Sequence, residues 1–125
     1  MAEVEIDGHS LTIEGAISVV NGDNTAVLPQ SARSRMEESR KVVDQITDSG
    51  EVVYGINTGF GAMSSVRIAG DDLEQLQTNL IKSHACGVGD LMNPEHVLLM
   101  MVFRANSLAK GVSVSYTHLR AHETN

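Results

Sequence analysis

The sequence feature that most constrains the fold is an uninterrupted run of seven apolar residues, Val97–Phe103. The run lies in a predicted helix that begins with Asn93 as its N-cap, has Pro94 in its first turn and ends at Gly111. Seven consecutive apolar residues leave this helix almost no polar face, so it needs neighbours on most sides. A chain of 125 residues offers few such neighbours, and we therefore expect part of the protein to be missing from this sequence.

The N-terminal residues predict a short extended region. Val4 and Ile6 alternate with acidic residues, which is typical of a strand with one buried face. The turn Gly8-His9-Ser10 separates them from residues 11–13, so we expect the two segments to pair as a short hairpin. Residues 26–28 predict a further extended piece, which Pro29 ends.

The rest of the periodic pattern is helical and predicts a mainly α chain. Residues 14–20 predict one or two helical turns. A longer amphipathic helix is expected from a Ser31 cap to a Gly50 stop, and another from Asp71 or Asp72 to Gly87 and Gly89. The apolar face of the first contains Ala32, Met36, Val43 and Ile46, and that of the second contains Leu73, Leu76, Leu80 and Ile81, continued by His84 and Ala85.

Charge and composition argue against several classes of protein. Nine basic and 16 acidic residues give a net charge of −7, which disfavours binding to nucleic acid or to anionic lipid. The run Val97–Phe103 is far shorter than a membrane span of about 20 residues. Met1–Glu5 lacks the basic and apolar regions of a signal peptide, so a cytoplasmic location is expected. The single Cys86 has no disulfide partner within the chain and is interpreted as a small packed residue.

A glycine-rich segment, Tyr54–Gly61, reads YGINTGFG and contains three glycines within seven residues. Such a density requires unusual backbone angles or the close approach of another group. The spacing matches neither G-x-G-x-x-G nor G-x-x-x-x-G-K-[ST], so a phosphate-binding loop is not indicated. Taken alone, the segment is equally compatible with a flexible surface connection.

The segment Tyr54–Gly61 resembles the tyrosine loop of the histidine and aromatic amino acid ammonia-lyases. The similarity continues in collinear order through Leu76–Gly89 and Arg104–Gly111 and covers about residues 3–113. The resemblance implies that residues 1–113 are the N-terminal portion of a large helical-bundle lyase. Residues 114–125 do not match the family pattern and are expected to be a non-native tail.

The resemblance also implies a reaction, the elimination of ammonia from an L-amino acid. Tyr54 would be the catalytic base, although a tyrosine in another context would be interpreted as an aromatic anchor of the loop. An unperturbed phenol titrates near pH 10, so a tyrosine base needs surroundings that favour its anion. His84, Asn57 and Gly61 would contact the substrate; for Asn57 a role as a turn residue or in positioning the base stays open. His84-Ala85 preceded by Ser83 resembles the histidine-specific pattern, so L-histidine is the favoured substrate and urocanate the product.

The family's cofactor cannot form from this chain. It is 4-methylideneimidazol-5-one (MIO), made from an Ala-Ser-Gly tripeptide that the sequence lacks; the nearest string, Asp48-Ser49-Gly50, is interpreted as a helix end. His118 and His122 are too few ligands for a zinc site, and no metal is expected.

The expected partners are a small amino acid substrate and, in the full-length enzyme, further copies in a homotetramer, with no nucleic acid and no membrane. The alternatives are an aromatic amino acid lyase or 2,3-aminomutase of the same family, or a non-catalytic helical interaction module.

Overall fold

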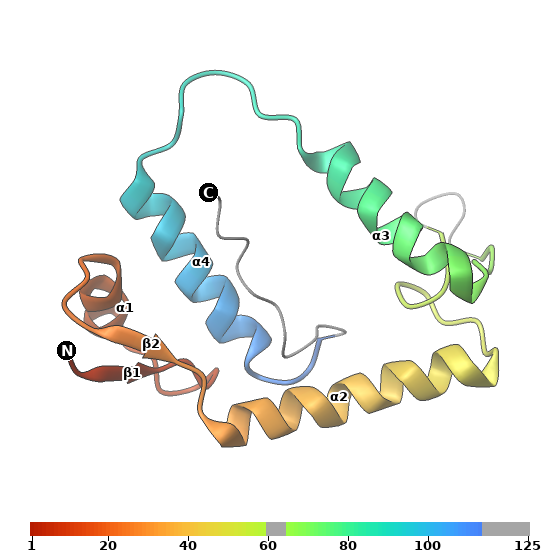
Figure 1. Ribbon diagram of the computed structural model, residues 1–125, viewed down its shortest axis with the longest axis horizontal. Coiled ribbons are helices and arrows are strands. Elements are labelled where there is room, and N and C mark those ends of the chain that lie inside the picture. Colours follow the sequence, from red (N-terminus) through yellow and green to blue (C-terminus); the bar gives the residue numbers. More distant parts are fainter. Residues whose placement is uncertain (60–64, 114–125) are drawn as a thin grey trace. The chain divides into compact units, whose positions relative to one another are not determined.

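The computed structural model describes residues 1–59 and 65–113 and divides into two compact units. The first unit contains Met1–Lys41 together with the residues from Leu91 on, and the second contains Val42–Asp90. Four helices and one two-stranded sheet make up the regular structure of the described residues (Figure 1). The prediction of a mainly α chain with a short extended region at its N-terminus is therefore confirmed.

The extended region pairs differently from the predicted hairpin. Strand β1 (Glu3–Glu5) lies parallel to β2 (Thr25–Val27), with Val4 opposite Ala26. Helix α1 (Ile13–Val20) connects them, and Thr12 caps it because its Oγ1 accepts a hydrogen bond from the Gly15 amide at 3.0 Å. Thr12 and Ile13 thus form the start of a helix instead of a strand, so the prediction that residues 11–13 pair with β1 is wrong. The partner of β1 is instead the strand reached after the helical crossover.

Helix α2 (Gln30–Ser49) confirms the predicted amphipathic helix but begins one residue before the predicted cap, Ser31. The carbonyl of Pro29 accepts the first helical hydrogen bond, from the Arg33 amide at 3.1 Å, so Ser31 lies inside the first turn. Gly50 ends the helix with φ = +77°, a conformation that favours glycine. The predicted apolar face is confirmed: Ala32, Met36 and Val43 are buried, and Ile46 is half-buried.

Helix α3 (Gly70–His84) also lacks the predicted side-chain cap. Ala69 occupies the N-cap position without a side-chain hydrogen bond, so Asp71 and Asp72 lie within the first turn and the prediction that one of them is the cap is wrong. The amide of Asp72 donates to the Ala69 carbonyl at 2.9 Å, which starts the helix through the backbone alone. The helix ends at His84, before the predicted stop at Gly87 and Gly89.

Helix α4 (Pro94–Leu108) begins as predicted, with the Asn93 side chain accepting from the Glu95 amide at 2.8 Å. Its C-terminal end contributes to the core of the first unit, where Ala109 is buried with Ile6 and Ala32. The Gly8 amide donates to Asn106 Oδ1 at 2.8 Å and joins the turn after β1 to the same end of α4.

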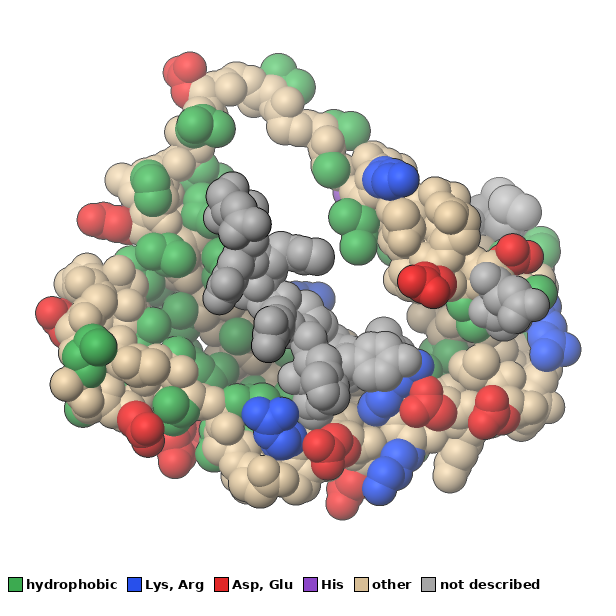
Figure 2. All heavy atoms as spheres, viewed as in Figure 1, with side chains coloured by type: hydrophobic (Ala, Val, Ile, Leu, Met, Phe, Trp, Pro, Cys, Tyr) green, Lys and Arg blue, Asp and Glu red, His purple; other side chains and the backbone are tan. Residues whose placement is uncertain are grey.

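Most of α4 is nevertheless uncovered by the described residues. Five large apolar side chains of the predicted run are between 40% and 60% exposed: Val97, Leu98, Met100, Met101 and Phe103. Hydrophobic side chains are accordingly visible over the surface of the first unit (Figure 2). The described residues therefore leave this helix with fewer neighbours than its apolar composition requires. None of the helices in residues 1–59 and 65–113 is long and apolar enough to cross a membrane.

Candidate active site

The candidate site is built on the loop that leaves α2 at Gly50 and enters α3 at Gly70. Its two arms pair antiparallel: Thr58 bridges to Arg67, and the Gly59 amide donates to the Val66 carbonyl at 3.1 Å. We call residues 51–59 and 65–69 the tyrosine loop. Gly61, a predicted substrate contact, lies outside the described residues.

Tyr54 stands at a tight turn of the tyrosine loop. The amides of Ile56 and Asn57 donate to the Val53 carbonyl at 3.1 and 3.3 Å, and this closes the turn over Tyr54 and Gly55. Gly55 has φ = +80°, a backbone angle that residues other than glycine rarely adopt. The turn leaves the Tyr54 side chain 64% exposed, so a ligand can reach it.

Two polar side chains of the loop are buried beneath this turn. Asn57 is 2% exposed and Thr58 is 1% exposed. Thr58 Oγ1 accepts from the Gly55 amide at 3.4 Å and donates to the Gly59 carbonyl at 3.0 Å. Both side chains bond to loop backbone, which is how buried polar groups are normally satisfied. Thr58 was not among the predicted site residues. The available signal was a hydroxyl between Gly55 and Gly59 that can hydrogen-bond to nearby backbone.

His84 is the last residue of α3 and is exposed. Its Nδ1 lies 2.8 Å from the Leu80 carbonyl oxygen and 3.0 Å from Ser83 Oγ. Because a carbonyl only accepts, the contact with Leu80 places the proton of the neutral ring on Nδ1. The other ring nitrogen, Nε2, then presents a lone pair, so His84 offers a hydrogen-bond acceptor to a ligand.

The structure places Tyr54, Asn57 and His84 in one unit, Val42–Asp90, on two of its elements. Tyr54 and Asn57 lie on the tyrosine loop, before α3 begins at Gly70, and His84 is the last residue of that helix. The length of α3 therefore separates His84 from the other two residues along the chain. Their roles in substrate binding and catalysis stay predictions.

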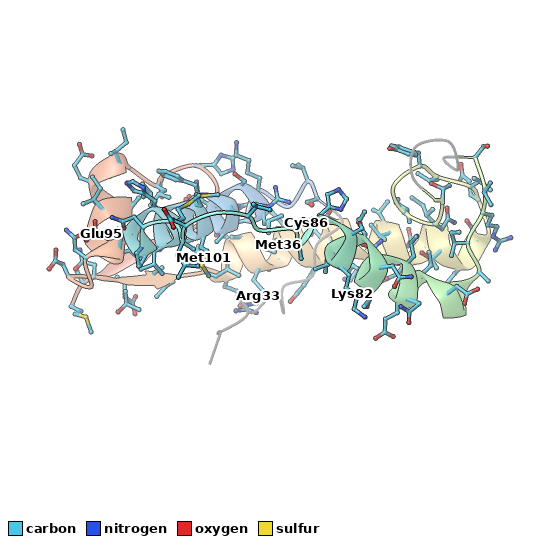
Figure 3. All side chains as sticks on the ribbon, turned by 90° about the horizontal axis from the view of Figure 1, so that it is seen from above. Arg33, Met36, Lys82, Cys86, Glu95 and Met101 are labelled. Atoms are coloured by element: carbon cyan, nitrogen blue, oxygen red, sulfur yellow. The ribbon has the colours of Figure 1, made fainter. Side chains whose placement is uncertain are left out.

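Cys86 differs from its prediction as a small packed residue. It is exposed, and its Sγ lies 3.5 Å from the Ser83 carbonyl. Figure 3 labels it beyond the end of α3, with Lys82 in the last turn of that helix. The packing prediction is wrong for this chain because the segment from 85 to 93 is exposed throughout.

Within residues 1–59 and 65–113, no three His, Cys, Asp or Glu side chains are grouped closely enough to hold a metal ion. His118 and His122, the pair considered in the sequence, lie outside these ranges.

Comparison with known proteins finds relatives that match most of this chain. A family model described as aromatic amino acid lyase matches residues 11–121. The histidine ammonia-lyase of Caldanaerobacter subterraneus is 49% identical over 113 residues, which are 90% of this chain and 22% of that protein. The chain therefore spans about a fifth of the length of the curated relatives it matches.

Solved structures with a similar fold also match most of this chain. The tyrosine aminomutase of Streptomyces globisporus matches with a TM-score of 0.81 and 32% identity, over 88% of this chain and 21% of that one. The histidine ammonia-lyase of Trypanosoma cruzi matches with a TM-score of 0.79 and 38% identity, over 87% of this chain and 21% of that one. Because the family model also covers most of the sequence, the chain belongs to the aromatic amino acid lyase family.

Proposed function

We propose that the full-length protein containing this chain is an ammonia-lyase that converts L-histidine to urocanate. The observation that carries the proposal is the tyrosine loop, which presents an exposed Tyr54 on a turn fixed by two buried polar side chains. The identity of 49% to a histidine ammonia-lyase supports the choice of reaction.

Tyr54 is proposed to be the general base of this reaction. Elimination requires removal of a weakly acidic proton from the β-carbon of the amino acid, and the deprotonated Tyr54 Oη would accept it. The exposed position of the side chain allows a substrate to reach that oxygen. A methylidene-imidazolone would supply the electrophile that activates the amino acid, but the 125 residues contain no Ala-Ser-Gly to form it. The proposal therefore applies to the full-length protein.

His84 is proposed to select the substrate. Its Nε2 lone pair, fixed by the bond between Nδ1 and the Leu80 carbonyl, can accept a hydrogen bond from the ring N–H of histidine. A phenyl ring offers no such donor and would leave the acceptor unpaired once it is covered, at a cost of about 1–3 kcal/mol. His84→Phe is expected to lower the specificity for histidine relative to phenylalanine by about 10- to 100-fold.

The proposal is testable in a full-length hybrid, in which residues 1–113 of this chain are joined to the remaining part of the Caldanaerobacter histidine ammonia-lyase. The hybrid is expected to release ammonia and urocanate from L-histidine. Tyr54→Phe should lower kcat by at least about 100-fold, the contribution typical of a positioned base. Thr25→Val, which removes an exposed hydroxyl from β2, is the control and should leave kcat unchanged.

Four outcomes would contradict parts of this proposal. Full activity of Tyr54→Phe would remove Tyr54 from the role of base. A preference for tyrosine or phenylalanine over histidine would favour an aromatic amino acid lyase, and a β-amino acid product would indicate an aminomutase, the activity named for one structural relative. A hybrid that folds without any elimination activity would favour a non-catalytic helical module.

Assembly is proposed to be homotetrameric and the location cytoplasmic. The apolar side chains of α4 that the described residues leave 40–60% exposed need cover in the full-length protein. Light scattering of the hybrid would test the assembly, and a monomeric mass would contradict it.

A further inference from the structure

We propose that Asn57 is a positioning residue that sets the backbone turn carrying Tyr54, and that it does not contact the substrate. The inference rests on the proposed function of Tyr54 as the base. It goes further because it gives a separate task to a side chain for which the sequence left several roles open. It follows from where the polar atoms of Asn57 find their partners.

The carboxamide of Asn57 bonds to the backbone on the N-terminal side of Tyr54. Oδ1 accepts from the Val53 amide at 2.9 Å, and Nδ2 donates to the Glu51 carbonyl at 2.6 Å. The side chain therefore gives residues 51–53 the hydrogen bonds that a neighbouring strand would otherwise provide. Tyr54 follows directly, so its backbone position depends on these two bonds.

The backbone of Asn57 fixes the other side of the same turn. Its amide donates to the Val53 carbonyl at 3.3 Å, and its carbonyl accepts from the Ile68 amide at 2.9 Å. The first bond closes the turn, and the second ties it to the arm of the loop that leads into α3. Each of the four polar atoms of Asn57 thus has a partner within the tyrosine loop.

Burial separates the tasks of the two residues. Asn57 is 2% exposed, whereas Tyr54 is 64% exposed. A ligand can therefore reach the phenol of Tyr54 from solvent, whereas the carboxamide of Asn57 is enclosed by the loop. Removal of the carboxamide would leave the Val53 amide and the Glu51 carbonyl without these partners. Because an unsatisfied polar group within the fold is costly, the turn is expected to be released and Tyr54 displaced.

The chemistry of the position explains why asparagine suits it. The substitution Asn57→Asp would keep an acceptor for the Val53 amide, but it would place a second oxygen against the Glu51 carbonyl in place of a donor. The substitution Asn57→Ala would provide neither bond. The two variants therefore remove one and both of the contacts.

The test uses the full-length hybrid and two measurements. Hydrogen exchange of the Val53 amide should become at least about 10-fold faster in Asn57→Ala, since the amide loses its acceptor, and should stay slow in Asn57→Asp. In Asn57→Ala, kcat should fall about 10- to 100-fold and KM should change less than about 2-fold, because a small displacement of a reacting group is enough for such a loss. Asn57→Asp should lose less kcat, and Asn21→Ala, at an exposed position after α1, should match the parent.

The outcomes separate this inference from the proposed function. A KM raised about 10-fold or more at unchanged kcat would mean that Asn57 binds the substrate, and slow Val53 exchange in Asn57→Ala would mean that it does not hold the turn; either result overturns the inference. Fast exchange together with a fully active Tyr54→Phe would overturn the role of Tyr54 and with it the link to catalysis. If Asn57→Ala does not fold, Asn57→Asp decides: an unchanged kcat would then contradict the inference.

Discussion

Replacing Gly111 with alanine tests a close approach of two backbone segments in the first unit. Gly111 has φ = +72°, and a Cβ added to it would lie 2.7 Å from Arg35 Cβ, 2.8 Å from the Arg35 carbonyl carbon and 2.9 Å from its oxygen. Two of these three atoms belong to the backbone of α2, which cannot turn aside as a flexible side chain could. Gly22 has a similar φ of +80° but open space around the added Cβ.

The two glycines separate the cost of conformation from the cost of overlap. A left-handed conformation costs an L-residue about 1–2 kcal/mol, and the lower entropy of the unfolded chain returns about 0.4–1 kcal/mol. Gly22→Ala should therefore lose about 1 kcal/mol. Gly111→Ala carries the same terms and an overpacking cost of about 1–3 kcal/mol, so it should lose about 2–4 kcal/mol.

Urea unfolding of the 125-residue chain, followed by far-ultraviolet circular dichroism at low micromolar concentration, measures this difference. With a slope of about 1.5 kcal/mol per molar urea, the midpoint of Gly111→Ala should lie about 1–2 M below that of Gly22→Ala. Equal losses in the two variants would refute the close approach between α2 and Gly111.

Activity, association and acid stability provide three further tests. The 125-residue chain should not deaminate histidine, because it has a candidate base but no Ala-Ser-Gly; urocanate formed faster than by its Tyr54→Phe variant would contradict this. Above the low micromolar concentration used for unfolding, the chain should self-associate through α4, and Met100→Lys, which changes a 60% exposed side chain, should reduce light scattering; a monodisperse parent chain would be the opposite result. The amides of Ser10 and His9 donate to Asp7 and lower its pKa to about 2, whereas an unfolded aspartate titrates near about 3.9. Asp7 thus stabilises the fold above about pH 4 and loses this effect as the pH falls through about 2. Over this range the urea midpoint of Asp7→Asn should fall less than that of the parent chain, and an equal fall would show that Asp7 does not contribute.

Local chemistry made the start of α4 and the candidate loop predictable. Asn93 and Pro94 start a helix through contacts within two residues, and Gly55 of the tyrosine loop adopts φ = +80°, a conformation that favours glycine. The apolar run Val97–Phe103 likewise indicated, from its composition alone, a helix with missing neighbours. These features depend on residues close together in the chain, so the sequence was sufficient to predict them.

Long-range partners were decided only in the folded chain. The alternation around Val4 predicts a strand, but its parallel pairing with β2 follows from the Thr12 cap, which turns the intervening residues into a helix. The starts of α2 and α3 use backbone carbonyls of Pro29 and Ala69, which carry no side-chain signal. From the sequence, Asn57 was a candidate turn residue, ligand contact or positioning residue for the base. Its four bonds exist because the loop closes on residues as distant as Ile68. A buried polar side chain is directed by the groups that the fold brings to it, and the sequence names the side chain without naming those groups.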